Sequence, residues 1–373
     1  MSSQQKKITR KAFIRNVGIA SIGGAALLNS CAKESETFGN KRPDKIYKWK
    51  MVTTWPPNFP VLGEGCNLFA KWVKQMSNGR LDITVYGSGE LIPALEVFYA
   101  VSSGTAEIGN GASYYWAGNS PATPFFASIP FGMNAQQMMA WIESGGGKKL
   151  WQNLYNRFNL VPFASGNTGV QMGGWFNKEI NTIEDLRGLK MRIPGIGGKV
   201  LEKAGGTAVL SAGGEIFTNL ERGVIDATEW IGPYHDYKMG FQNIAKYYYY
   251  PGWHEPGTIL ETIINKEKLT SLPEDLQLIL ETAAAKQYIW TLSEFEAKNN
   301  EYLDKIISES KVEIRKFPKE VLEKLKSLAK ETMQEICDGD QDAASIYKSF
   351  IRFKETMNKW ANLTEAPFYN DIK

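Results

Sequence analysis

The chain has 373 residues, 43% of them hydrophobic, so it is long enough for about two domains and can bury a sizeable core. Five of its 43 basic residues and none of its 40 acidic residues lie in Met1–Ser30, so the rest carries a net charge near −2. This balance disfavours a nucleic-acid binder. Three cysteines without metal-ligand spacing and only two histidines supply zinc or copper chemistry poorly.

The N-terminus has the pattern of a secretory signal. Its basic region ends at Arg15, and the apolar run Val17–Leu28 that follows is too short to span a bilayer comfortably. We predict a lipoprotein-type signal peptide over residues 1–30 and a polar tether over residues 31–45. The stretch Thr9–Arg15 resembles a twin-arginine signal with lysine in the second position, so Sec and twin-arginine export both stay open.

A cysteine stands directly after the apolar run. Leu28-Asn29-Ser30-Cys31 resembles a bacterial lipobox, which implies cleavage before Cys31 and acylation of its thiol. Two or more acyl chains, at about 0.8 kcal/mol per buried methylene, would anchor the protein to a membrane surface. The alternative is an ordinary signal that is cut elsewhere and leaves a free cysteine. Cys66 and Cys337 then remain, either as buried thiols or as one disulfide.

Strands and helices alternate in the first part of the folded chain. The expected strands are Tyr47–Trp55, Leu81–Tyr86 and Ala106–Ala112, with helices at about Asn58–Met76 and Ile92–Ser102. This order predicts an α/β unit with parallel pairing. Near the strand ends stand Trp55, Tyr114 and Tyr115, which either pack on the carbon skeleton of a ligand or cap the core.

A helical pattern over 135–158, broken by glycines, and a strand over 160–165 lead into the segment Asn167–Trp230. In it we expect a helix start at Thr182, a strand Leu189–Ile193 that ends beside Arg192, and a second strand that ends at Glu229 and Trp230. In open α/β sheets, ligands bind in the crevice beyond the carboxyl ends of the strands. The segment therefore predicts one wall of an anion site.

The remaining chain is mostly helical. An aromatic-rich stretch crosses back at Tyr247–Gly257, a strand follows at Thr258–Asn265, and long helices are expected at 274–309, 319–338 and 343–362. The last helix has an apolar stripe formed by Ile346, Phe350, Phe353, Met357 and Trp360. Such a stripe covers the protein's own core or binds a partner.

Several motifs together resemble the extracytoplasmic solute-binding proteins of tripartite ATP-independent periplasmic (TRAP) transporters, nearest the branch that binds α-keto and related carboxylic acids. The motifs are Gly87–Pro93, Leu186–Gly195, Phe217–Trp230 and Tyr249–Gly257, and the similarity covers nearly everything after Lys45. The resemblance implies an α/β, two-lobe periplasmic-binding-protein-like fold with mainly parallel sheets. It also implies lobes linked by crossing strands and long helices, an extra C-terminal helix, and no catalytic residues.

The resemblance also implies the site. Arg192 is expected to hold the carboxylate of a small organic acid, since a guanidinium fork matches a carboxylate bidentately. The alternative for Arg192 is a structural salt bridge. A sodium or calcium ion beside the ligand is expected on the Gln171 side-chain oxygen, the carboxylates of Glu229 and Glu255, and the backbone carbonyl of Trp230. The expected ligand contacts are Arg192, Gln171, Asn167, Trp55, Tyr114, Tyr115 and Trp230.

The expected organisation follows the family. Lobe I comprises 46–165 plus about 256–300, lobe II comprises 166–255 plus about 301–342, and 343–373 forms a C-terminal helix like the one by which some members dimerise. We expect a lipid-anchored periplasmic protein, a homodimer that delivers its ligand to the small and large TRAP membrane subunits. Two other classes stay open: a sensor that binds without transport, and a glycosidase that uses the carboxylate pair Glu229 and Glu255.

Overall fold

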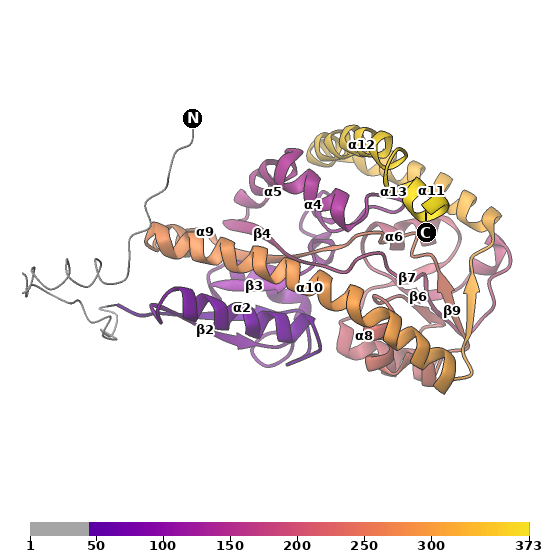
Figure 1. The fold of residues 1–373 in the computed structure, drawn as a ribbon, viewed down its shortest axis with the longest axis horizontal. Helices are drawn as coiled ribbons and strands as arrows, with labels where there is room; N and C mark the ends of the chain where they lie inside the picture. The colour runs from indigo at the N-terminus through magenta and orange to yellow at the C-terminus, as the bar shows by residue number, and fades with distance from the viewer. Residues whose placement is uncertain (1–44, 373) are drawn as a thin grey trace, which may run out of the picture. The chain divides into compact units, whose positions relative to one another are not determined.

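The computed structural model describes residues 45–372, and the predicted signal peptide, the tether up to Asp44 and Cys31 lie outside these described residues. Two sheets organise this part of the chain, with strand orders β2-β1-β3-β10-β4 and β11-β9-β5-β8-β6-β7 (Figure 1). The strands are β1 (Tyr47–Thr53), β2 (Leu81–Tyr86), β3 (Ile108–Gly111), β4 (Leu160–Asn167), β5 (Gly174–Phe176), β6 (Lys190–Arg192), β7 (Thr207–Val209), β8 (Ala227–Thr228), β9 (Tyr247–Tyr250), β10 (Ile259–Asn265) and β11 (Glu313–Lys316). We refer to the elements around each sheet as the first half and the second half.

Both sheets are mixed, as the crossings of the chain require. In the first sheet β1 pairs in parallel with β2 and β3, whereas β10 runs antiparallel to β3 and β4 because it returns from the second half. In the second sheet β6 is parallel to β7 and β8, while β5 is antiparallel to β8 and β9. With the parallel pair β9 and β11, five of the nine pairings are parallel. The predicted α/β fold class is confirmed.

Helices cover both sheets. They are α2 (Leu62–Met76), α3 (Val97–Ser102), α4 (Ala135–Ser144), α5 (Gly147–Asn156), α6 (Gly195–Lys203), α7 (Ile216–Glu221), α8 (Pro233–Met239), α9 (Lys266–Thr270), α10 (Glu274–Glu309), α11 (Lys319–Gly339), α12 (Gln341–Ala361) and α13 (Glu365–Pro367). The longest, α10, packs on α2 and β4 of the first half and on α8 of the second half. Within residues 45–372, no helix combines the length and apolarity that a membrane span needs.

The predicted elements agree with the structure except where strands are very short. The expected helix 274–309 and strand 81–86 have the observed bounds. Strands β5, β7, β9 and β11 were not expected, and β9 lies inside the stretch predicted only as an aromatic crossing. Strands of three or four residues owe their existence to hydrogen bonds with distant neighbours, so the local pattern carries little of the signal.

The two cysteines in the described residues are free, which excludes the disulfide between them. Cys66 is buried on α2 and donates from Sγ to the Leu62 carbonyl at 3.3 Å. Cys337 is half-buried on α11. Burial raises the pKa of the Cys66 thiol, so this group is an inert part of the core.

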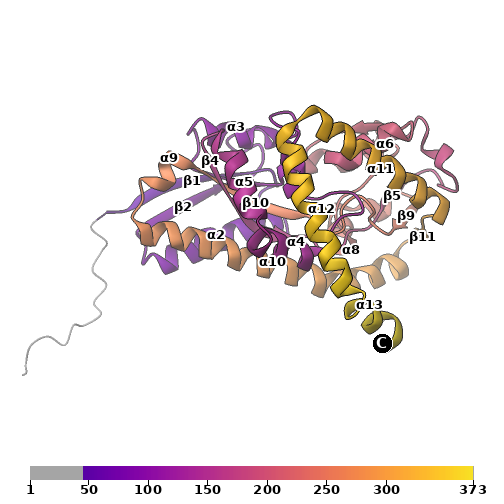
Figure 2. The same cartoon turned by 90° about the horizontal axis from the view of Figure 1, so that it is seen from above.

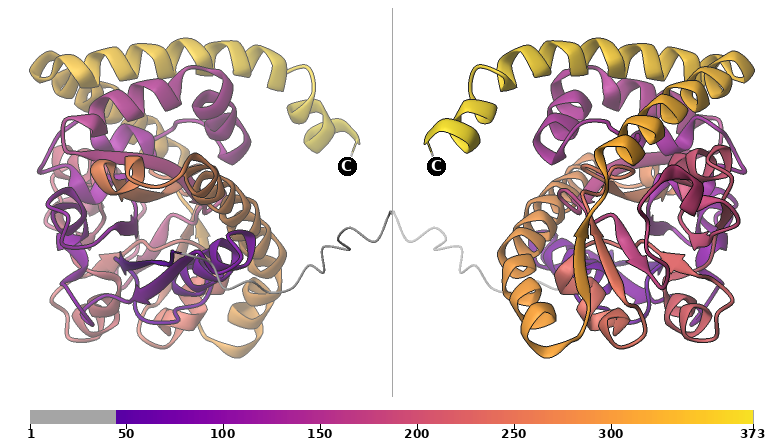
Figure 3. Two further views of the ribbon diagram at one scale, coloured as in Figure 1. Left: turned by 90° about the vertical axis from the view of Figure 1, so that its left-hand side faces the viewer. Right: turned by 90° about the vertical axis from the view of Figure 1, so that its right-hand side faces the viewer.

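The apolar stripe of α12 has two different environments. Ile346 and Phe350 are buried against the first half, so this end of the stripe covers the protein's own core. Trp360, near the other end, is 59% exposed. Figures 2 and 3 show α12 lying across the helices α4 and α5 and the following C-terminal segment projecting away from them.

The buried carboxyl group of Glu261 on β10 makes stability depend on pH. Its Oε1 accepts hydrogen bonds from Trp116 Nε1 at 2.5 Å and Tyr155 Oη at 3.2 Å, and burial raises its pKa to about 8. The folded state thus retains a proton that the unfolded chain releases above its ordinary pKa of 4.5. The contribution of this group to the free energy of unfolding is therefore fully present below pH 4.5 and is lost as the pH rises toward 8.

Glu261→Gln should remove this loss, because an amide oxygen still accepts both hydrogen bonds without ionising. The wild-type chain should lose up to about 1.4 kcal/mol per pH unit through this group relative to the variant. Chemical denaturation at pH 5, 6.5 and 8 measures the difference, and Glu355→Gln, an exposed change on α12, is the control. Equal pH slopes for the Glu261 variant and the wild type would contradict the assignment.

Candidate functional site

Two neighbouring strand ends of the second sheet bring an arginine and a carboxylate together. Arg192 is the last residue of β6 and pairs with Thr228 at the end of the parallel strand β8. Glu229 follows at once, and its N–H donates to the Arg192 carbonyl at 3.1 Å. The sequence predicted this meeting of Arg192 and Glu229 because parallel strands end at the same edge of a sheet.

Arg192 is 1% exposed, and every polar contact of its guanidinium lies inside the protein. Nη1 forms an ion pair with the equally buried Glu229 carboxylate, and Nη2 donates to the Tyr115 hydroxyl at 3.2 Å. Nε lies 3.5 Å from the Ser211 carbonyl, and the guanidinium carbon lies 5.2 Å from the centre of the Trp230 ring. In this structure the carboxylate that the guanidinium holds is therefore that of Glu229.

A second buried carboxylate enters from the crossing between β9 and β10. Glu255 Oε2 accepts hydrogen bonds from Gln171 Nε2 at 2.8 Å and from Thr258 Oγ1 at 2.6 Å. Gln171 comes from the crossing between β4 and β5, and its backbone N–H donates to the Glu255 carbonyl at 3.3 Å. These two crossings between the halves thus lie side by side, and both contribute to the site.

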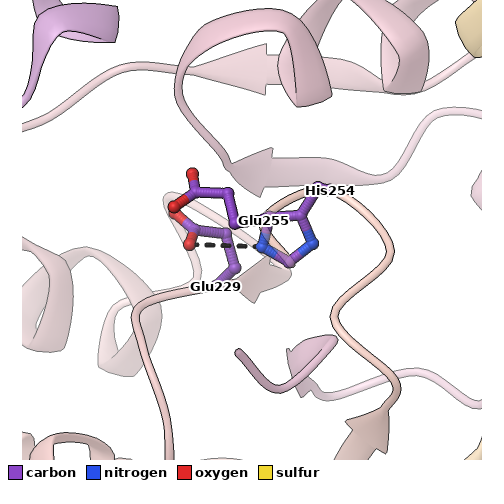
Figure 4. Close-up of side chains that lie close together, drawn as sticks. All are labelled: Glu229, His254 and Glu255. Carbon is purple, nitrogen blue, oxygen red and sulfur yellow. Dashed lines mark ion pairs between the residues drawn. The ribbon is translucent and has the colours of Figure 1, made fainter. Parts of the chain in front are cut away.

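His254 completes the cluster. One ligand atom each of Glu229, His254 and Glu255 lies within 4.8 Å of the others, and all three residues are buried. Figure 4 shows the two carboxylates close together with the imidazole beside Glu229; Nε2 lies 3.4 Å from Glu229 Oε2. Neither ring nitrogen makes a hydrogen bond within the part of the chain that the structure describes. His254 was not predicted, since sequence reasoning considered only oxygen donors for a hard cation.

The electrostatics of this cluster favour an added positive charge. Burial raises the pKa of Glu229 to about 7, and burial together with the charge of Glu229 raises that of Glu255 to about 7. Burial lowers the pKa of His254 to about 4, so the imidazole is neutral at pH 7 and brings no charge of its own. The guanidinium pairs with Glu229, and a cation between the two carboxylates would lower both of their pKa values by stabilising the ionised forms.

The predicted cation ligands fit such an ion. Gln171 Oε1 is buried and has no hydrogen-bond partner among residues 45–372, although Nε2 of the same amide donates to Glu255 and Thr168. Amide oxygens and carboxylates are the kinds of donor that sodium and calcium prefer. Trp230 follows Glu229 directly, so its backbone lies at the same strand end.

Aromatic rings from both halves surround the charges. Trp230 of the second half meets Trp55 and Phe59 of the first half edge-on, with centroid distances of 6.5 and 6.4 Å. Tyr114 and Tyr115 are largely buried on the 3₁₀ turn Ser113–Trp116, and both hydroxyls stay protonated because burial raises their pKa values. These rings exclude water from the cluster, which strengthens the electrostatic interactions inside it.

The helix that begins at Gly195 brings the halves into contact. Gly195 has φ +63°, and a Cβ atom there would stand 2.9 Å from Tyr114 Cβ, so no other residue fits without strain. His235 of α8 makes a second contact: its Nε2 donates to the Pro60 carbonyl at 2.6 Å, with Phe59 packed edge-on against the ring. His235 and Phe59 were not predicted, because no local pattern marks a contact between distant segments.

Asn167 lies at the end of β4, close to the site, but both polar atoms of its side-chain amide form hydrogen bonds with backbone groups. Its Oδ1 accepts from the Gly169 N–H at 2.9 Å, and its Nδ2 lies 3.3 Å from the Gly257 carbonyl. In this structure Asn167 ties the two crossing segments together. Of the predicted residues, the cluster itself therefore contains Arg192, Gln171, Glu229, Glu255, Trp230 and Tyr115, with Trp55 and Tyr114 packed around it.

Comparison with known proteins gives the family. Residues 51–340 match the family model described as bacterial extracellular solute-binding protein, family 7 (DctP). A monocarboxylate 2-oxoacid-binding periplasmic protein from Nostoc sp. is 40% identical over 323 residues, which cover 87% of this chain and 88% of the relative.

Two solved structures have the same fold. A TRAP periplasmic solute-binding protein from Colwellia psychrerythraea, with bound calcium and pyruvate, is 43% identical with a TM-score of 0.85. Its counterpart from Pseudoalteromonas atlantica, with bound sodium and pyruvate, is 42% identical with a TM-score of 0.86. Each match covers 88% of this chain and 100% of the other.

These matches confirm the predicted resemblance, the periplasmic location and the placement among transport proteins rather than enzymes. They also confirm that homologous proteins carry a sodium or calcium ion together with their ligand. The chain belongs to family 7 of the bacterial extracellular solute-binding proteins and is a periplasmic solute-binding protein of the TRAP type.

Proposed function

We propose that this protein captures a small 2-oxo monocarboxylate, such as pyruvate, together with a sodium or calcium ion, and delivers it to TRAP membrane subunits. The observation that carries the proposal is the buried group of Arg192, Glu229 and Glu255 with the unpartnered Gln171 oxygen, enclosed by residues of both halves. The relatives and structures that bind 2-oxo acids support the choice of ligand.

Each charge has a separate task in this proposal. Two carboxylates would repel an anionic solute by about 4 kcal/mol per charge pair at 4 Å and an effective dielectric constant of 20. A cation held by Glu229, Glu255, Gln171 and the Trp230 carbonyl removes this repulsion. It also weakens the hold of Glu229 on Arg192, so the guanidinium fork becomes available to the carboxylate of the solute.

The wider organisation is also proposed. The two sheets support a division into lobe I (46–165 plus about 256–300) and lobe II (166–255 plus about 301–342), between which the solute is held. We also propose that acyl chains on Cys31 anchor the protein to the membrane. A sensor role without transport would use the same site, so transport requires a test with the membrane subunits: solute uptake by vesicles that contain them should depend on this protein.

Replacing Arg192 with lysine should weaken pyruvate binding by about tenfold to a hundredfold, because lysine keeps the charge but loses the fork. Lysine is preferable to alanine, which would leave the Glu229 carboxylate buried without its partner and destabilise the fold. Titration calorimetry in buffer with sodium and calcium gives the affinity. Arg187→Lys, an exposed change five residues away, is the control. Wild-type affinity in the Arg192 variant would exclude it as the solute's main contact.

Removing the cation should weaken pyruvate binding. Dialysis against a chelator, followed by titration in sodium-free buffer, should reduce the affinity, and adding back calcium or sodium should restore it for whichever ion the site uses. Glu255→Gln should shift the cation concentration needed for half-maximal binding upward by about tenfold or more, because it removes one charged ligand. Pyruvate affinity that is indifferent to all ions would remove the cation from the proposal.

The C-terminal segment is proposed to form a homodimer. Beyond the buried part of α12, the exposed apolar side chains are Trp360 (59%), Leu363 (77%), Phe368 (51%) and Ile372 (75%). A cluster of exposed apolar side chains of this kind marks a protein interface.

Trp360→Glu combined with Leu363→Glu should convert a dimer into a monomer at micromolar concentration, measured by sedimentation equilibrium. Lys348→Glu on the same helix is the control and should leave the mass unchanged. A strictly monomeric wild-type protein at these concentrations would contradict the dimer.

A further inference from the structure

One bulky residue outside the solute site has a backbone conformation that side chains rarely adopt. Phe131, in the loop between the 3₁₀ turn Thr123–Phe126 and α4, has φ +56°. For a bulky residue the left-handed region costs of the order of 1–3 kcal/mol and persists only where the surroundings hold it. Phe131 is held in this conformation by contacts with α12 on one side and with Trp253 on the other.

On one side, α12 holds the loop. The Lys354 ammonium donates a hydrogen bond to the Phe131 carbonyl. The next residue, Gly132, is packed so closely that a Cβ atom would stand 3.2 Å from Phe350 Cζ of the same helix. Lys354 is half-buried, and its pKa is lowered by burial and by the nearby Lys326 of α11. Water is partly excluded from this ammonium, so its hydrogen bond to the Phe131 carbonyl is stronger than one in full contact with solvent.

On the other side, the same residue holds the crossing segment 253–257. The Phe131 N–H donates to the Trp253 carbonyl at 2.7 Å, and the two rings stack with centroids 5.8 Å apart. A Cβ atom on Gly257 would stand 2.5 Å from the backbone of Asn134, so the two backbones touch. This segment carries His254 and Glu255 into the solute site.

Lys354 is thus connected, through Phe131, to the segment that carries His254 and Glu255. Its ammonium holds the carbonyl of Phe131, and the N–H and ring of Phe131 hold Trp253, which immediately precedes His254 and Glu255. We infer that Lys354 of α12 is a positioning residue for the solute site and acts through Phe131 on the segment that carries Glu255. The inference rests on the proposed function, since it adds a distant residue to the same cation and carboxylate site.

The test compares Lys354→Met, Lys354→Arg and a matched Lys348→Met, in which an exposed lysine of the same helix is replaced. Lys354→Met should weaken calcium binding to the ligand-free protein by about fivefold to tenfold, and pyruvate binding in the presence of calcium by a similar factor. Lys354→Arg should restore both affinities to within about twofold of the wild type, and Lys348→Met should change neither.

A merely structural lysine would give a different result. If Lys354→Met lowers the melting temperature of the free protein but leaves both affinities unchanged, the inference is wrong. Phe131→Leu, which removes the stacked ring, supplies a double-mutant cycle with Lys354→Met. If the double variant loses less affinity than the product of the two single-variant factors, Lys354 acts through Phe131. A loss equal to that product contradicts the inference.

The two readouts separate this inference from the proposed function. If the wild-type protein binds calcium but not pyruvate, only the proposed solute is wrong. The calcium affinities of the Lys354 variants then still decide the role of Lys354. Wild-type protein that binds pyruvate, with Lys354→Met binding both pyruvate and calcium equally well, would leave the proposed function standing and overturn only the role of Lys354.

Discussion

The structure depends on one electrostatic constraint: Glu229 and Glu255 are buried beside the single guanidinium of Arg192. Removing such groups from water costs several kcal/mol each, and one arginine cannot compensate two carboxylates. Nothing in the cluster offsets this imbalance, because the surrounding rings exclude water and the neutral His254 adds no charge. Such a site favours binding of a cation and, once the cation is bound, binding of an anion.

The fold assembles the polar groups of the site from two strand ends and two chain crossings. Arg192 and Glu229 end adjacent parallel strands, whereas Gln171 and Glu255 lie on the two chain crossings between the halves. None of these four residues lies in the first half alone. The first half contributes an uncharged group, the Tyr115 hydroxyl, which accepts a hydrogen bond from Arg192. The charges therefore belong to the second half and the crossings, and the first half supplies mainly rings that close over them.

The sequence predicted the parts of this site that follow local rules and missed those that follow from packing. Arg192 and Glu229 could be placed because strand ends share an edge, and Gln171 and Glu255 because they stand in motifs of a recognisable family. His235 and Phe59 were missed because their importance lies in contacts between distant segments, and His254 because only oxygen donors were expected for a hard cation. Likewise β9 and β11 are defined by pairing with each other rather than by a local alternation.

The helix α10 restricts how the halves can move. At about 1.5 Å per residue its 36 residues extend about 54 Å, and it packs on β4 and α2 in the first half and on α8 in the second. Long helices bend only gradually unless proline, glycine or a bulge interrupts them, and α10 contains neither proline nor glycine. Any movement of one half relative to the other must therefore bend α10 gradually or shift the side chains packed along it.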